Sequence, residues 1–219
     1  MRPIYLISKT PYEGVIHIPI LTIRFLSPVI NFSDYEGVVF TSKQGVLSLQ
    51  NYLPDWNRLK CICVSESTAK KAREAGAIDV EVANGYGDSI PDILGAKKRK
   101  GKWLYLRPKV VASDWVESAR NRGITIDEAI VYESVCNEEM SNFPVSQEGV
   151  LIFTSPSAIR CFLQNHKILP THDVIVIGET TKNALPADVL SYLSEAASIE
   201  ATVNLARQIA IKSKNSSPF

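Results

Sequence analysis

Short apolar runs alternate along the chain with longer segments that carry apolar residues at helical spacing. Several of the runs are apolar at consecutive positions, which is typical of strands buried on both faces of a parallel sheet. The pattern therefore predicts an α/β fold with mainly parallel strands, flavodoxin-like or Rossmann-like. The predicted strands are Ile4 to Ser8, Val38 to Thr41, Cys61 to Val64, Val80 to Val82, Trp103 to Arg107, Leu151 to Thr154 and Val174 to Gly178.

Five of the intervening segments predict helices. Serine stands where three of them need an N-cap, and glycine stands where two of them end. The serines are Ser65, Ser113 and Ser155, and the glycines are Gly76 and Gly123. The helical segments are KQGVLSLQNYL from Lys43, ESTAKKAREAG from Glu66, SDWVESARNRG from Ser113, PSAIRCFLQNH from Pro156 and ETTKNAL from Glu179.

Two strand-to-helix junctions occur twice in the chain. GVVFTS, ending at Ser42, returns as GVLIFTS, ending at Ser155, and VSEST, ending at Thr68, returns as IGETT, ending at Thr181, at the same sequence offset. The shared register predicts two copies of one α/β unit. A weaker echo relates IYLISKTP at the N-terminus to WLYLRPK from Trp103.

The position of that echo predicts a discontinuous first lobe. The late copy finds its missing strand only at the N-terminus, so we expect residues 1–17 and 135–219 to form one α/β lobe and residues 25–127 the other. HIPILTIRF and ITIDEAIVYES supply two connector strands, 18–24 and 128–134. A two-stranded connector predicts a hinge and a cleft between the lobes, lined by the carboxyl ends of the strands.

Composition narrows the ligand class. The 219 residues include 24 lysines and arginines and 23 aspartates and glutamates, so the formal charge is +1. The chain therefore has no general field to attract nucleic acid or an anionic membrane, and an anionic ligand must be held locally. The most apolar stretch, Val15 to Ile30, is broken by charges and prolines, and MRPIYLISK is too short for a signal peptide. We expect a soluble cytoplasmic protein.

The cysteines and histidines indicate neither a metal site nor a disulfide scaffold. The four cysteines lack CxxC spacing and only three histidines are present, so we expect reduced thiols and no metal. Cys61 and Cys63 alternate along a predicted strand, and we expect both to be core residues. His17, His166 and His172 read as structural, GYGDS from Gly85 as a plain loop, and KKRK from Lys97 as a solvated turn.

The FTS and IGETT junctions, the VYES connector and the interrupted duplication together resemble the uroporphyrinogen-III synthase family. LIFTSPSAIRCFL and VIVIGETTKNAL are the most specific tracts. The resemblance implies a cofactor-free, monomeric cytoplasmic enzyme that converts hydroxymethylbilane into uroporphyrinogen III with loss of water. It also implies inversion of ring D through a spiro intermediate, and transient contact with hydroxymethylbilane synthase.

The substrate that the resemblance implies carries eight carboxylates. Helix N-termini behind hydroxyl-bearing turns accept carboxylates without lysine, because their backbone N–H groups are free. The candidate substrate-binding residues are Ser42, Ser65, Thr68, Ser155, Thr180 and Thr181, with the cations Lys9 and Arg107. The alternative is that the hydroxyls are ordinary helix caps, each worth about 1 kcal/mol, and that the cations are solvated.

Tyr132 matches the tyrosine that the family places at its active site. Its phenol could protonate or hydrogen-bond the leaving hydroxyl group, and the alternative is an aromatic residue that only packs against the connector. Where the family often carries an arginine after the FTS serine, this chain has Gln44, with Lys43 beside it.

A rival function uses the same residues without chemistry. A non-catalytic two-lobed module that binds an anionic small molecule would need the same hydroxyl-bearing turns. Tyr132 in the connector and the full set of paired junctions favour the enzyme.

Overall fold

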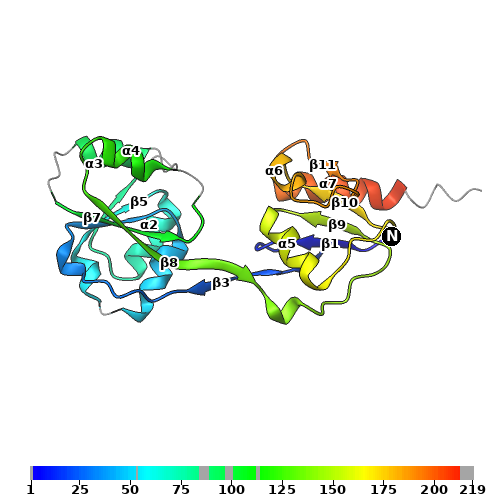
Figure 1. Cartoon of the computed structure of the whole chain (residues 1–219), viewed down its shortest axis with the longest axis horizontal. Coiled ribbons are helices and arrows are strands. Elements are labelled where there is room, and N and C mark those ends of the chain that lie inside the picture. The colour runs from blue at the N-terminus through cyan, green and yellow to red at the C-terminus, as the bar shows by residue number, and fades with distance from the viewer. Residues whose placement is uncertain (1, 53, 84–88, 97–100, 112–113, 213–219) are drawn as a thin grey trace, which may run out of the picture. The chain divides into compact units, whose positions relative to one another are not determined.

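A computed structural model of the chain describes residues 2–52, 54–83, 89–96, 101–111 and 114–212 (Figure 1). Ser113, the KKRK run and most of GYGDS lie outside these ranges. The chain forms two compact units. The first contains Met1–Thr22 and Val135–Phe219, and the second contains Ile23–Ser134.

The first unit is built on a five-stranded sheet. Its order is β11-β10-β9-β1-β2, and the neighbouring strands are parallel. The three central strands are buried along nearly their whole length, as the continuous apolar runs predict. The strands are β1 (Ile4–Ile7), β2 (Ile16–Ile18), β9 (Val150–Phe153), β10 (Asp173–Val176) and β11 (Tyr192–Leu193).

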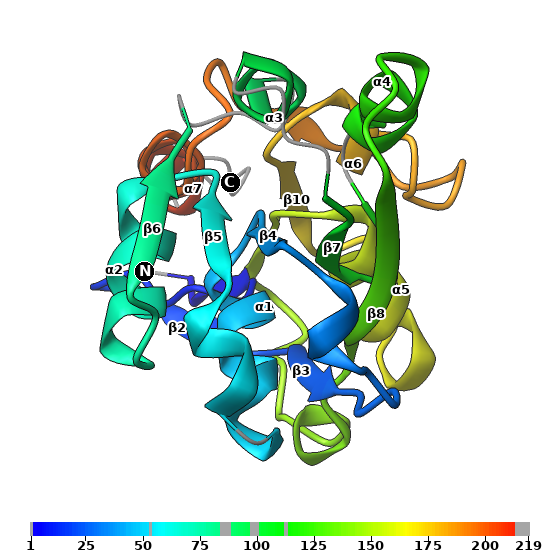
Figure 2. The same cartoon turned by 90° about the vertical axis from the view of Figure 1, so that its left-hand side faces the viewer.

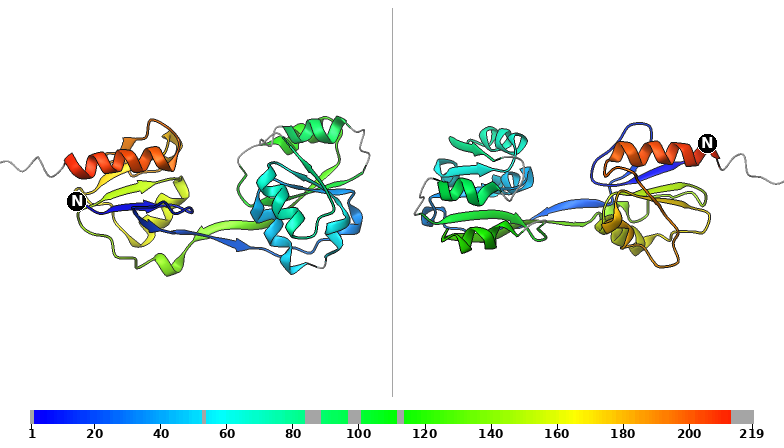
Figure 3. Two further views of the ribbon diagram at one scale, coloured as in Figure 1. Left: turned by 180° about the vertical axis from the view of Figure 1, so that it is seen from behind. Right: turned by 90° about the horizontal axis from the view of Figure 1, so that it is seen from above.

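Helices cover both faces of this sheet. Figures 1 and 3 show α5 (Pro156–Asn165) on one face and α7 (Ile199–Lys212) on the other. Successive side chains of β1 point to opposite faces, so Tyr5 and Ile7 join the core under α5, and Ile4 and Leu6 join the core under α7. The short helices of this unit are η5 (Glu138–Met140) and α6 (Glu179–Lys182).

The second sheet has six strands in the order β3-β8-β7-β4-β5-β6. Figure 2 shows β6, β5, β4, β7 and β8 side by side, and the neighbours from β8 to β6 pair in parallel. The strands are β3 (Leu21–Phe25), β4 (Gly37–Phe40), β5 (Lys60–Cys63), β6 (Asp79–Val82), β7 (Trp103–Pro108) and β8 (Ile126–Cys136).

Two pairs of helices cover this second sheet. One core joins side chains of α1 and α2 to Val38, Phe40 and Leu104, and the other joins α3 and α4 to Val39 and Trp103. The α-helices are α1 (Lys43–Leu47), α2 (Glu66–Glu74), α3 (Ile90–Ala96) and α4 (Trp115–Asn121), and the short 3₁₀ turns are η1 (Phe32–Asp34), η2 (Ser48–Asn51) and η3 (Pro54–Arg58).

The predicted α/β class with mainly parallel strands is confirmed, and all seven predicted strands occur. The helix predicted from Lys43 ends early, at Leu47. Ser48 Oγ donates a hydrogen bond to the carbonyl of Gly45 at 2.6 Å, and the chain continues as η2. Helices α3 and α7 lie outside the predicted set.

Gly76 and Gly123 end helices as predicted. Their φ angles of 99° and 77° are left-handed, a region that favours glycine. After each glycine the next N–H bonds back into the helix, from Ala77 to Ala72 O and from Ile124 to Ala119 O. These bonds satisfy carbonyls that the helix end would otherwise leave open.

The two segments predicted as connector strands belong to the sheets. HIPILTIRF is divided around Pro19 into β2, which pairs with β1, and β3, which lies beside β8. β8 begins earlier than the predicted connector, and its residues from Ile126 to Tyr132 pair with β7. The apolar alternation of this segment marks an ordinary strand of the sheet over most of its length.

The expectation that all cysteines are reduced is wrong for two of them. Cys136, at the end of β8, forms a disulfide with Cys161 in α5, and their Cα atoms lie 5.3 Å apart. The sequence separation of 25 residues gives no indication of this proximity, which the packing of α5 creates. Cys61 and Cys63 are free and buried in the core, as predicted.

Candidate active site

The predicted site residues of the first unit meet at one edge of its sheet. Ile7, Phe153 and Val176 are cross-strand partners at the carboxyl ends of β1, β9 and β10. The residues that follow these strands therefore share one edge. They are Lys9 after β1, Ser155 after β9, and Thr180 and Thr181 after β10.

The second unit gathers its predicted site residues in the same way. Phe40 pairs with both Cys63 and Leu106, so the carboxyl ends of β4, β5 and β7 lie together, and the end of β7 pairs with Tyr132 in the middle of β8. The residues beyond these positions are Ser42, Ser65, Thr68, Arg107 and Tyr132. Each unit thus presents one group of hydroxyl-bearing turns.

Three of the serines are N-caps in the structure. Ser42 Oγ accepts the N–H of Gln44 at 3.1 Å, and Ser155 Oγ accepts the N–H of Ala158 at 3.2 Å. Ser65 Oγ accepts the N–H of Thr68 at 3.4 Å and also contacts the hydroxyl of that threonine at 3.1 Å. An accepting cap still carries its own O–H, so capping does not exclude donation to a carboxylate.

The threonines differ in exposure. Thr68 and Thr181 are 2% and 3% exposed, whereas Thr180 is exposed at the start of α6. The N-cap of α6 is Gly178, which has no side chain to occupy the N–H groups of that turn. Thr180 and the backbone of this turn are therefore accessible to a ligand, whereas burial limits the access of a ligand to the side chains of Thr181 and Thr68.

The two candidate cations lie in different surroundings. Lys9 is exposed, but the neighbouring protein removes part of its water and lowers the pKa of its ammonium group. Arg107 Nε pairs with Glu128 Oε1 at 2.8 Å, and Arg107 Nη1 donates to the carbonyl of Pro108 at 3.1 Å. Glu128 therefore offsets much of the charge of Arg107.

Tyr132 is buried, with 6% of its surface exposed. Burial raises the pKa of its phenol, and a hydrogen bond with Ser42 lowers the pKa in part. The nearby Tyr105 raises the pKa further. The phenol is therefore protonated at neutral pH and is a hydrogen-bond donor there.

Tyr105 is a residue of this edge that the sequence patterns did not single out. It lies in β7, only 3% of its surface is exposed, and its Oη is 2.8 Å from Thr41 Oγ1. The available signal was a polar aromatic residue near the carboxyl end of an otherwise apolar strand.

A buried carboxylate lies next to Tyr132 in β8. Glu133 Oε1 accepts hydrogen bonds from Arg24 in β3, including one from Nε at 2.9 Å, and Glu133 Oε2 pairs with Lys109 Nζ at 3.1 Å. The hydrogen bonds from Arg24 and Lys109 lower the pKa of Glu133. Because Lys109 follows β7, this carboxylate ties together three neighbouring strands.

The histidines have structural partners. His17 Nε2 lies 3.0 Å from Ser8 O, His166 Nε2 lies 2.9 Å from Phe143 O, and His172 Nε2 lies 2.8 Å from Ser146 O. Among the described residues, no group of three or more histidine, cysteine and acidic side chains could hold a metal ion. In the same part of the chain, no helix is both long and apolar enough to cross a membrane.

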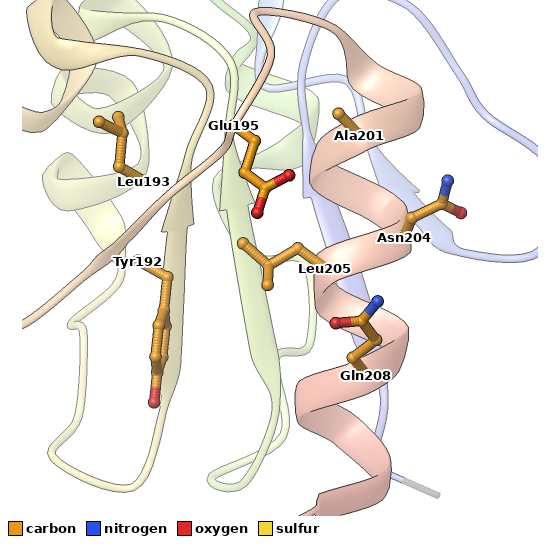
Figure 4. Close-up of a pocket in the computed structure, with 7 residues that line it drawn as sticks. All are labelled: Tyr192, Leu193, Glu195, Ala201, Asn204, Leu205 and Gln208. Atoms are coloured by element: carbon orange, nitrogen blue, oxygen red, sulfur yellow. The ribbon is translucent and has the colours of Figure 1, made fainter.

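A pocket of about 390 Å³ lies elsewhere in the first unit, between β11 and α7 (Figure 4). Among the described residues that line it, Glu195 is the one with a charged side chain, and Figure 4 shows its carboxylate between the strand and the helix. A carboxylate without a cation disfavours a polyanionic ligand. The other lining residues are Tyr192, Leu193, Ala201, Asn204, Leu205 and Gln208.

The chain as a whole is similar to solved structures of uroporphyrinogen-III synthases. The chain is similar to the uroporphyrinogen-III synthetase of Helicobacter pylori 26695, with 25% identity and a TM-score of 0.74, over 95% of this chain and 100% of that one. A uroporphyrinogen III synthase structure from Thermus thermophilus is more distant, with 13% identity, a TM-score of 0.43, and coverage of 96% of this chain and 100% of that one.

No curated protein sequence matches the chain. A family model described as HEM4, uroporphyrinogen-III synthase HemD, matches residues 13–204. These residues include most of both units and eight of the nine predicted site residues, with Lys9 outside the match. Members of this family are lyases of heme biosynthesis that act on hydroxymethylbilane and give uroporphyrinogen III. The chain belongs to the uroporphyrinogen-III synthase family.

Proposed function

We propose that the hydroxyl-bearing turns of the two units bind the carboxylates of hydroxymethylbilane and that Tyr132 assists the departure of its terminal hydroxyl group. The observation that carries this proposal is the register of the two sheets. It brings the candidate residues of each unit to the carboxyl edge of its parallel strands, the edge at which such sheets bind ligands.

Helix starts, and not a cluster of lysines, are the groups of this chain that suit a polycarboxylate. With a formal charge of +1, the protein has little attraction for anions as a whole. The helix starts at Ser42, Ser65, Ser155 and Gly178 supply backbone N–H groups and the positive end of the helix dipole. Each unit would bind a subset of the eight carboxylates.

The proposed chemical step requires only a weak acid. The pyrrole nitrogen pushes electron density toward the terminal hydroxymethyl carbon, and the C–O bond breaks as the oxygen takes a proton and leaves as water. The substituted carbon of ring D then attacks the resulting azafulvene and forms the spiro intermediate. A phenol that is protonated at neutral pH can hydrogen-bond the departing oxygen, and we assign this role to Tyr132.

Control of geometry is the larger contribution. Without the protein, the linear tetrapyrrole closes without inversion of ring D. Binding the carboxylates at fixed turns would hold the chain ends so that the hindered carbon attacks, which is the positional effect that enzymes use most effectively.

The proposed enzyme acts as a monomer in the cytoplasm and receives its substrate through transient contact with hydroxymethylbilane synthase. The instability of the open-chain substrate favours rapid transfer. Sedimentation of the purified protein at several concentrations tests the monomer, and a concentration-dependent increase in mass would contradict it.

Product analysis tests the function. Hydroxymethylbilane is supplied to the purified protein, the product is oxidised, and the uroporphyrin isomers are separated by chromatography. We expect the type III isomer to predominate, at a rate above that of a protein-free blank. Formation of the type I isomer alone, at the blank rate, would contradict the function and leave only an anion-binding module.

A further inference from the structure

A second buried phenol is fixed beside the turn that carries Ser42. Tyr105 in β7 forms a hydrogen bond with Thr41, with 2.8 Å between Tyr105 Oη and Thr41 Oγ1. Its ring packs against Trp115, with 4.8 Å between the ring centroids. Both ends of the side chain are therefore held, and only 3% of its surface is exposed.

Thr41 joins this phenol to the proposed catalytic group. The next residue, Ser42, has an extended backbone, and its hydroxyl interacts with the phenol of Tyr132, which lies in β8 opposite Pro108 at the end of β7. Thr41 follows β4, which lies beside β7, and β7 lies beside β8. Two phenols from neighbouring strands thus meet one turn, each through a different hydroxyl of that turn.

We propose that Tyr105 is a positioning residue for ring closure: by fixing Thr41 it sets the place of the Ser42 hydroxyl, which in turn holds the phenol of Tyr132. This inference rests on the proposed role of Tyr132. Tyr105 does not contact the substrate, because its hydroxyl is bound to Thr41 and its ring is enclosed by the core under α4.

The hydroxyl of Tyr105 contributes little to packing. A phenylalanine would fill the same space against Trp115, and a buried hydroxyl requires a partner that phenylalanine does not need. A role limited to the core would therefore leave the turn unaffected by loss of the hydroxyl. A positioning role predicts a slower reaction in a protein of nearly unchanged stability.

The first test is Tyr105→Phe. We expect kcat to fall about tenfold and KM to change less than twofold, since a misplaced acid affects the reaction more than binding. Thr41→Val should reproduce this result and Thr41→Ser, which keeps the hydroxyl, should retain the activity. Tyr35→Phe is the matched control, because Tyr35 binds Asp127 at 2.9 Å and stands before β4, at the opposite edge of the same sheet. We expect it to leave kcat unchanged.

The combined variant Tyr105→Phe with Tyr132→Phe tests the connection between the two phenols. If Tyr105 acts through Tyr132, the double variant reacts no more slowly than Tyr132→Phe alone, after the uncatalysed rate is subtracted. Multiplied losses would overturn the inference, and so would an unchanged kcat in Tyr105→Phe. If Tyr132→Phe itself keeps full activity, the proposed role of Tyr132 fails and this inference fails with it. If Tyr105→Phe keeps the kcat of the wild type while Tyr132→Phe loses activity, this inference fails and the proposed role of Tyr132 stands.

Discussion

Arg24 Nε donates a hydrogen bond to Glu133 Oε1 across 2.9 Å, from β3 to the neighbouring strand β8. Lys109 Nζ pairs with the other carboxylate oxygen at 3.1 Å. The carboxylate of Glu133, the residue after Tyr132, thus forms ion pairs with two cations. Hydrogen bonds from both cations lower the pKa of Glu133 below its ordinary value of 4.5.

This arrangement predicts a pH-dependent effect of Glu133→Gln. A carboxylate whose pKa is lowered in the folded state contributes stability above its unfolded pKa, and this contribution disappears as the pH falls through the folded pKa. We expect the variant to be less stable than the wild type at pH 7 and the difference to disappear as the pH falls through the folded pKa of Glu133, which lies below 4.5. Urea unfolding at several pH values measures the difference. A difference in the free energy of unfolding that stays constant at all pH values would show that the shape of the Glu133 side chain, and not its charge, stabilises the fold.

Tyr132→Phe should lower kcat by about one to two orders of magnitude, because it removes the proposed proton donor and leaves the ring in place. Thermal unfolding should remain close to that of the wild type. Since burial raises the pKa of the phenol, kcat of the wild type should show no loss from Tyr132 ionisation until the pH exceeds 10. Unaltered turnover in the variant would reduce Tyr132 to a packing residue.

Ser155→Ala separates capping from substrate binding. Ser198 is a matched control in the same unit, since its Oγ accepts the N–H of Ala201 at 3.1 Å at the start of α7. Both substitutions should destabilise the protein by about 1 kcal/mol, the usual value for a lost cap. Only Ser155→Ala should also raise KM for hydroxymethylbilane. Equal KM values in both variants would assign Ser155 to capping alone.

Thiol titration checks the cysteine pairing. Burial raises the pKa of Cys61 and of Cys63 to about 12, so both thiols should react slowly in the folded protein. After unfolding without reductant, two thiols should react, and after reduction all four. Cys161→Ser should cost about 3.5 kcal/mol of stability, the chain-entropy value for a loop closed over 25 residues. Four reactive thiols before reduction would contradict the disulfide.

The strands were predictable because their signal is local. Runs such as those ending at Phe40 and Phe153 are apolar at successive positions, and a strand buried on both faces demands this pattern. The repeated junctions also gave the candidate hydroxyl positions, because an N-cap follows a strand at a fixed distance in both copies. The shared carboxyl edge then follows from parallel pairing.

The features that the sequence did not reveal depend on contacts between distant segments. The pairing of Cys136 with Cys161 requires α5 to pack beside the end of β8. The partners of Glu133 come from Arg24 and Lys109, which lie far away along the chain. In the sequence, Tyr105 is one residue of an apolar run, and its hydrogen bond with Thr41 depends on β4 lying beside β7. Such contacts carry no periodic signal.

The binding of product to the turns is tested most directly by chemical shifts of the backbone amides of the full chain. Uroporphyrinogen III, kept under argon, is titrated into ¹⁵N-labelled protein. We predict that the largest shifts occur at the starts of α1, α2, α5 and α6, where Ser42, Ser65, Ser155 and Gly178 stand. Shifts confined to the pocket between β11 and α7, with those helix starts unchanged, would contradict the account.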